Sequence, residues 1–260
     1  MQYTLDQCID QGKREYQEDC FLVCEKSGYL FVSVFDGHGD MTCSHYIRDQ
    51  MKQAFMSLNL NVDDIFHMTV FYEQICMAWM NEASDLRMRN KQKESESGTT
   101  WSGILIERVS GRGLTMNIGD SGILIHHHGN LRYNTKNPTL KNEQVRAEVR
   151  ARTDYDCIQY EDGEYRIVDK EGHQSINMAG AIGDLFTTGI SRALCRNVMI
   201  EKIQLSPQST IVLATDGLLD VMNAKEIGLA LKAGKTAKDL VEIANTREKG
   251  DNVTVLLINT

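Results

Sequence analysis

The chain has 260 residues, which suits one large domain or two small ones, and we expect a single domain over residues 1–260. Its hydrophobic content of 42% and charged content of 25% are ordinary globular values, which excludes a disordered, collagen-like or membrane-spanning chain. The formal net charge of -8 argues against nucleic acid and anionic membranes as partners. Seven cysteines without a C-x-x-C pair, and no basic-then-apolar leader at residues 1–10, favour reduced thiols and a cytoplasmic location.

Short apolar runs rich in β-branched residues predict buried strands that end in turns. These runs occupy residues 30–35, 103–108, 115–118, 122–127, 199–205, 210–215 and 253–258. Apolar residues spaced by three or four predict two amphipathic helices, over residues 47–58 and 65–86. Residues 225–231 and 236–245 also predict helices, and Thr236 and Asp239 open the second in a capping-box-like arrangement. Strand runs that enclose pairs of helices indicate a β-sandwich flanked by helices, which is an α+β fold.

The middle of the chain has a different character. Residues 134–175 are polar and charged, with weak helical character at 140–152 and weak strand or turn character at 160–168. We therefore expect an irregular, flap-like inserted subdomain at about 134–190. The polar stretch at residues 90–97 predicts a loop.

Acidic residues recur at the ends of the predicted strands. Glu18 and Asp19 precede the run 21–23, Asp36 follows 30–35, Asp120 follows 114–118, Asp216 follows 211–215, and Asp251 precedes 253–258. If these carboxylates converge, each pair at a separation of about 4 Å repels by roughly 4 kcal/mol at an effective dielectric near 20. Such a cluster needs hard cations that prefer oxygen ligands, so the sequence predicts magnesium or manganese.

The densest motif is Asp36-Gly37-His38-Gly39-Asp40, directly after a predicted strand. Taken alone it indicates a tight turn, because Asp-Gly and glycine-flanked residues supply the backbone angles that turns need. Asp216-Gly217-Leu218-Leu219-Asp220 repeats the layout of a strand, Asp-Gly and a second aspartate, and Gly250-Asp251-Asn252-Val253 places another acid beside a strand. Three such places favour a functional site over three unrelated turns.

Six sequence blocks carry a resemblance to a known family. The blocks are Arg14-Glu15-Tyr16-Gln17-Glu18-Asp19, Val34-Phe35-Asp36-Gly37-His38-Gly39, Ser97-Gly98-Thr99-Thr100, Asn117-Ile118-Gly119-Asp120-Ser121, Ala214-Thr215-Asp216-Gly217-Leu218-Leu219-Asp220 and Gly250-Asp251-Asn252-Val253-Thr254-Val255. In this order, and over essentially the whole chain, they resemble the metal-dependent protein serine/threonine phosphatases of the type 2C family. The resemblance implies two antiparallel sheets flanked by helices in a four-layer α-β-β-α arrangement. It also implies phosphorylated proteins as substrates, and we expect a monomer.

The resemblance implies two Mn²⁺ or Mg²⁺ ions per subunit and a weaker third. Asp36 would bridge the two ions, with Glu18 and the Gly37 carbonyl on one ion and Asp216 and Asp251 on the other. Asp120 and Asp220 match the family positions that hold the third ion. Paired ions about 3.5 to 4 Å apart lower the pKa of a bridging water, hold it in line with phosphorus and offset the developing charge.

Two further positions have implied roles in catalysis beside Asp36. Arg14 would clamp the substrate phosphate, since a guanidinium donates two parallel hydrogen bonds to phosphate oxygens. The alternative is a surface arginine paired with Glu18. His38 would be the general acid for the leaving alkoxide, because an imidazole that titrates near neutrality donates a proton at physiological pH.

One block departs from the family pattern, which shows Ser/Thr-Arg-Ala-Leu/Phe/Ile-Gly-Asp before the second Asp-Gly strand. Its letters are split here between Ala179-Gly180-Ala181-Ile182-Gly183-Asp184, which lacks the arginine, and Ser191-Arg192-Ala193-Leu194-Cys195-Arg196, which lacks Gly-Asp. Either segment could be the equivalent one. The departure concerns the inserted subdomain and its substrate contacts and leaves the carboxylates unaffected.

Other interpretations of the chain remain open. His126-His127-His128 invites a metal site, but adjacent strand residues face opposite sides of a sheet and Gly129-Asn130 marks a hairpin turn. A catalytically silent scaffold would be favoured by lost metal carboxylates, and none is lost. A phosphatase for a small phosphorylated metabolite would use the same catalytic residues.

Overall fold

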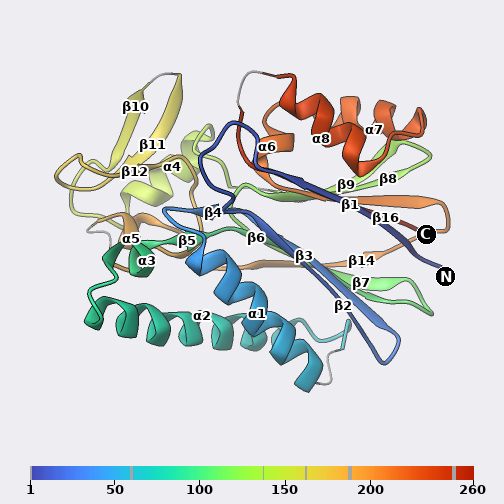
Figure 1. The fold of residues 1–260 in the computed structure, drawn as a ribbon, viewed down its shortest axis with the longest axis horizontal. Helices are drawn as coiled ribbons and strands as arrows, with labels where there is room; N and C mark the ends of the chain where they lie inside the picture. Colours follow the sequence, from blue (N-terminus) through green and yellow to red (C-terminus); the bar gives the residue numbers. More distant parts are fainter. Residues whose placement is uncertain (1, 59–60, 137, 162, 187–188, 248–249) are drawn as a thin grey trace.

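The computed structural model of the protein describes residues 2–58, 61–136, 138–161, 163–186, 189–247 and 250–260. Two five-stranded sheets lie face to face at its centre (Figure 1). The first has the order β1 (Thr4–Asp10), β16 (Val253–Asn259), β15 (Ser209–Ala214), β8 (Gly122–His127) and β9 (Asn130–Asn134). The second has the order β14 (Met199–Gln204), β7 (Arg112–Ile118), β6 (Trp101–Glu107), β3 (Tyr29–Phe35) and β2 (Cys20–Lys26). All of these pairings are antiparallel.

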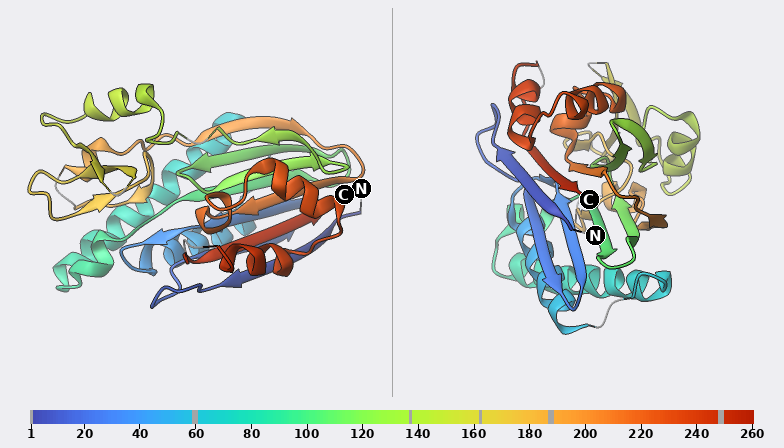
Figure 2. Two further views of the ribbon diagram at one scale, coloured as in Figure 1. Left: turned by 90° about the horizontal axis from the view of Figure 1, so that it is seen from above. Right: turned by 90° about the vertical axis from the view of Figure 1, so that its right-hand side faces the viewer.

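Helices cover the outer face of each sheet. α1 (Thr42–Ser57) and α2 (Ile65–Met88) pack on the second sheet, where the rings of Phe31 and Phe55 stack with their centroids 5.4 Å apart. α6 (Asp216–Leu219), α7 (Ala224–Lys232) and α8 (Ala237–Asn245) pack on the first sheet. A third apolar cluster fills the space between the sheets. The predicted α+β sandwich with α-β-β-α layers is therefore confirmed (Figures 1 and 2).

The local signals agree well with the observed elements. Each of the predicted strands and helices coincides with an observed one, and the capping box of Thr236 and Asp239 opens α8. β1 and β9 have no apolar run, since most of their side chains are exposed, and the sequence does not predict them. In the ranges that the structure describes, no helix has the combination of length and apolar character that a membrane span requires.

A small sheet closes one end of the sandwich. It has the order β13 (Ile182–Gly183), β5 (Gly98–Thr99) and β4 (Gly37–His38). The short helix α3 (Gln92–Glu96) precedes it, so the prediction of a loop over residues 90–97 is wrong for these five residues. α3 has too few residues to show helical periodicity, and it is held by tertiary contacts, because Ser95 is buried and Glu96 pairs with Arg87.

The inserted segment lies at the end of the sandwich opposite the two chain termini (Figure 2). It contains α4 (Glu143–Arg150), a three-stranded sheet of β10 (Ile158–Glu161), β11 (Glu164–Val168) and β12 (Ser175–Ile176), and the short α5 (Ile190–Ala193). These elements share their own apolar cluster, which includes Val149, Ile158, Ile167 and Ile190. The segment is therefore more regular than its polar composition predicts.

Candidate active site

The acidic residues of several strand ends meet at the end of the sandwich that carries the small sheet. Asp36 follows β3, Asp120 follows β7, Asp216 begins α6 directly after β15, and Asp19 precedes β2. Burial raises the pKa of Asp36 well above its ordinary value, and the carboxylates of Asp216, Asp19 and Asp120 raise it further. Carboxylates from the ends of four strands therefore lie within electrostatic reach of one another around Asp36.

Asp19 has a supporting position that the sequence does not reveal. Its side chain is buried, and one carboxylate oxygen accepts hydrogen bonds from the hydroxyls of Thr215 at 2.9 Å and Thr254 at 2.8 Å. The pKa of Asp19 is raised to about 7. Burial is the main cause and the charges of Asp216 and Asp251 add to it, whereas the hydrogen bonds from the two hydroxyls oppose it. Asp19 thus joins the start of β2 to β16 and to the end of β15 in the first sheet.

Glu18 and Gly37 are brought together by their backbones. The Glu18 carbonyl accepts a hydrogen bond from the Ser44 hydroxyl at 2.7 Å, and a Cβ atom at position 37 would overlap this same carbonyl oxygen. Only glycine therefore permits the approach. Burial raises the pKa of Glu18, and the nearby charges of His38, Arg14 and Lys93 act in the opposite direction.

Arg14 lies on the loop between β1 and β2, and its side chain is about half exposed. One terminal nitrogen donates to a carboxylate oxygen of Asp251 at 2.8 Å. The partner of Arg14 is therefore Asp251, and the alternative of a surface pair with Glu18 does not describe this structure. The rest of the guanidinium faces outward beside the carboxylates, where it can bind an anion.

His38 is held by a residue far away in the sequence. Its Nε2 atom lies 2.9 and 3.0 Å from the two carboxylate oxygens of Asp184, which is buried. Burial lowers the pKa of His38, but the carboxylates of Asp184, Asp120 and Glu18 together more than offset this effect, so the net pKa is raised. A Cβ atom at position 98 would overlap both side chains, so Gly98 is required for this contact.

The two halves of the split motif also have different places. Asp184 follows β13, whose pairing with β5 sets it beside His38, so the segment 179–184 reaches the site. The segment 191–196 packs behind it, and Arg196 donates to the carbonyls of Ala181 at 2.8 Å and Ser191 at 3.2 Å. The Gly-Asp half therefore contacts the candidate general acid, and Arg196 at the end of the other half supports the backbone of Ala181 that leads to it.

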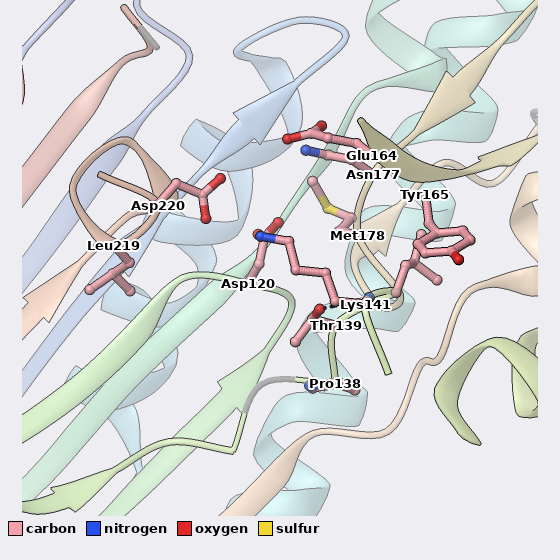
Figure 3. A pocket seen from close by; sticks show the side chains of 11 residues that line it. Asp120, Pro138, Thr139, Lys141, Glu164, Tyr165, Asn177, Met178, Leu219 and Asp220 are labelled. Carbon is pink, nitrogen blue, oxygen red and sulfur yellow. Dashed lines mark hydrogen bonds between the residues drawn. The ribbon is translucent and has the colours of Figure 1, made fainter. Parts of the chain in front are cut away.

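Asp120 and Asp220 line one cavity of about 210 Å³ between the sandwich and the inserted segment. Figure 3 shows both carboxylates on one side and Thr139, Lys141, Tyr165 and Asn177 on the other, with Lys141 extending toward Asp120. The two residues that the sequence assigns to a third ion thus face the same space. The inserted segment forms its opposite wall.

The histidine run lies elsewhere, in β8 and the turn after it. His126 is buried, and its Nε2 atom lies 3.1 Å from the carbonyl oxygen of Ala224. His128 has a positive φ of 50°, as its place in the turn requires. None of the three side chains takes part in the carboxylate cluster described above.

The donor atoms of this site suit particular ions. Within the described ranges, no three histidine, cysteine, aspartate or glutamate side chains already stand in ligating geometry. The cluster nevertheless consists of carboxylate oxygens and backbone carbonyls, which suit Mg²⁺ or Mn²⁺ better than softer metals. Burial is the main cause of the raised pKa values of Glu18, Asp19 and Asp36, and neighbouring carboxylates raise them further, so a bound cation would favour the ionised forms of all three. The residues present therefore fit divalent cations.

Comparison with solved structures shows the fold class. A C. elegans sex determining protein has a TM-score of 0.79 at 18% sequence identity, over 98% of this chain and 64% of that chain. Serine-threonine phosphatase 2C from Toxoplasma gondii has a TM-score of 0.71 at 19% identity, over 98% of this chain and 94% of that chain. The protein therefore has the fold found in type 2C phosphatases.

Sequence comparison shows the family. Residues 3–249 match the family described as Protein phosphatase 2C. Probable protein phosphatase 2C 27 of Arabidopsis thaliana is 25% identical over 98% of this chain and 68% of its own length. Protein phosphatase 1L of Bos taurus is 25% identical over 95% of this chain and 70% of its own length. The chain belongs to the protein phosphatase 2C family, a family of protein serine/threonine phosphatases.

Asn252 offers a test of how the site is held together. Its amide nitrogen donates to the carbonyls of Gln11 at 2.8 Å and Tyr16 at 3.0 Å, and its amide oxygen accepts from the Glu18 N–H at 2.8 Å. Asn252→Ala removes these three partly buried hydrogen bonds, so we expect the free energy of unfolding to fall by about 2 to 3 kcal/mol in chemical denaturation.

Asn259→Ala is the matched control, since Asn259 lies at the far end of β16, the strand that Asn252 precedes. Asn259 is exposed and accepts one hydrogen bond from Thr210 at 2.8 Å, so its loss should cost less than about 0.5 kcal/mol. Equal losses in the two variants would show that Asn252 does not hold the loop.

Proposed function

We propose that this chain hydrolyses phosphoserine and phosphothreonine in protein substrates with the help of divalent metal ions. The observation that carries the proposal is the convergence of carboxylates from separate strand ends around Asp36, with Arg14 and His38 beside them. The family match supports the same reaction. No carboxylate of the predicted set is missing, which argues against a silent scaffold.

The proposed ligands divide between two ions. Asp36 would contribute to both, Glu18 and the Gly37 carbonyl to one, and Asp216 and Asp251 to the other. Asp120 and Asp220, which share a cavity, would hold a weaker third ion. Bound Mn²⁺ or Mg²⁺ supplies a nucleophilic water at neutral pH and offsets the charge that develops on the phosphoryl group.

The protein side chains perform the remaining tasks. Arg14 binds and orients the phosphate with the guanidinium hydrogens that its bond to Asp251 does not use. Asp184 accepts a hydrogen bond from the Nε2–H group of His38, and this bond fixes the orientation of the ring. The Nδ1 atom of His38 is buried and has no hydrogen-bond partner among the described residues. The imidazole of His38 would hold the proton for the leaving alkoxide.

Metal binding can be tested through stability as well as through turnover. Asp36→Asn replaces a carboxyl whose ionisation the fold disfavours with an amide that is always neutral, so without metal we expect a higher midpoint of thermal unfolding than in the wild type. With saturating Mn²⁺ the order should reverse, because the wild type gains ligand stabilisation and the variant loses a shared ligand. Turnover should vanish in the chelated wild type and nearly vanish in Asp36→Asn.

His128→Ala is the control, since its side chain is exposed in a turn away from the cluster. It should keep the Mn²⁺-dependent rise in unfolding midpoint and most of the turnover. Full activity of the wild type after verified metal removal would contradict the proposal. So would an Mn²⁺ response that Asp36→Asn retains unchanged.

The role of His38 can be separated from folding by the choice of leaving group. His38→Ala should lower kcat/KM on a phosphoserine peptide by about a hundredfold or more, the usual scale of general acid catalysis. The loss should shrink sharply on p-nitrophenyl phosphate, because p-nitrophenolate leaves without a proton. An equal loss on both substrates, with chemistry rate-limiting and Mn²⁺ still bound, would make His38 a structural residue only.

A further inference from the structure

A second cavity opens beside His38, on the side of α3. Its volume is about 330 Å³, and it lies between α3 and the β12 edge of the inserted segment. The polar side chains that line it are His38, Lys93, Glu96, Gln174, Ser175 and Asp184. None of Lys93, Gln174 and Ser175 has a part in the proposed hydrolysis.

The charges on the wall of this cavity are unequally satisfied. Asp184 is bonded to His38, and Glu96 accepts from Gln92 at 3.0 Å and lies 3.4 Å from Arg87. Lys93, in contrast, has no ion-pair partner among the described residues, although Lys91 just before the same helix pairs with Glu94 at 3.5 Å. Lys93 is thus a positive charge on the cavity wall that no described carboxylate meets at ion-pair distance.

Lys93 is also partly positioned. Its ammonium lies 5.5 Å from the centre of the Tyr16 ring, which is a cation–π contact. Tyr16 is 65% exposed although it is large and aromatic, and it lies two residues after Arg14 on the same loop. The Lys93 charge lowers the pKa of Glu18 against the larger effect of burial, which places the ammonium within electrostatic range of the proposed metal site.

This arrangement suits a group next to the phosphorylated residue. With the phosphate at Arg14 and the leaving oxygen at His38, a neighbouring side chain of an extended peptide can enter the cavity that His38 and Lys93 share. A chain with net charge -8 repels anionic peptides in general, so a local cation has a large effect on which peptides bind.

We propose that Lys93, held against Tyr16, forms a subsite for an anionic side chain adjacent to the phosphoresidue of the substrate. The anion is either a carboxylate or a second phosphoryl group, since an ammonium is a point charge that accepts both. Gln174 and Ser175 on the opposite wall supply uncharged hydrogen-bond donors. The inference rests on the proposed function and adds a preference among its substrates.

The test uses phosphoserine peptides that differ at one position next to the scissile phosphoserine. That position carries Glu, phosphoserine, Gln or Lys, in one series before and in another after the reacting residue. For the wild type with Mn²⁺ we expect kcat/KM in one series to be about 2- to 5-fold higher for the Glu peptide than for the Gln peptide, a factor on the scale of an exposed ion pair. The Lys peptide should have the lowest kcat/KM in that series. A larger factor for phosphoserine would follow from its charge of nearly -2.

Lys93→Gln should bring the ratio of the Glu to the Gln peptide close to one. Lys91→Gln removes the same charge from the start of the same helix, at its N-cap, but from a residue already paired with Glu94, and should keep the wild-type ratio. Tyr16→Leu should weaken the preference in the same direction as Lys93→Gln. The ratio within each variant is the readout, so a general change in activity does not imitate the effect.

The possible outcomes separate the two proposals. Preference for both anionic peptides supports a carboxylate subsite, and preference for the phosphoserine peptide alone supports a subsite for a second phosphoryl group. A wild type that hydrolyses the Gln peptide as fast as the anionic ones would overturn the subsite but not the proposed function. An equal loss of preference in Lys91→Gln and Lys93→Gln would also overturn the subsite and leave the proposed function standing. Failure to hydrolyse any phosphopeptide with Mn²⁺ would overturn both.

Discussion

Repulsion among buried carboxylates is the constraint on which the rest of this structure depends. Four strand ends contribute these carboxylates, which belong to Asp36, Asp216, Asp19 and Asp120. The last three raise the energy of the ionised form of Asp36. The protein tolerates this arrangement because two large apolar layers and the filled space between the sheets stabilise the strands independently of their ends. The sandwich is in this sense a frame that holds like charges closer together than they would remain by themselves.

The fine placement of the groups depends on a few small or polar residues rather than on the apolar layers. Gly37 and Gly98 allow two backbones to approach where any side chain would overlap its neighbour. Asn252 connects the loop that carries Arg14 and Glu18 to the start of β16. Asp19 does the same for β2 through two threonine hydroxyls. Each of these contacts joins segments that lie far apart in the chain, so the geometry of the site is a property of the completed fold.

The sequence was sufficient for the framework but not for the contacts between distant segments. The sandwich, its helices and the strand-end acids follow from local periodicity and from short motifs, and these predictions agree with the structure. The pairing of His38 with Asp184 spans 146 residues, and no local pattern indicates it. α3 is too short to show a helical period, and that is why Lys93 falls within a stretch that reads as a loop. The ligand roles of Glu18, Asp36, Gly37, Asp216, Asp251, Asp120 and Asp220 stay predictions.

The inserted segment has an apolar cluster of its own, built from residues such as Val149, Ile158 and Ile167. It contributes one wall of each cavity beside the carboxylates, while the carboxylates themselves belong to the sandwich. Changes on its surface can therefore alter the shape and charge of these walls without disturbing the strands that carry the reacting groups. One wall of each cavity and the reacting groups thus belong to separately stabilised parts of one chain, so evolution or protein engineering can vary that wall while it retains the reacting groups.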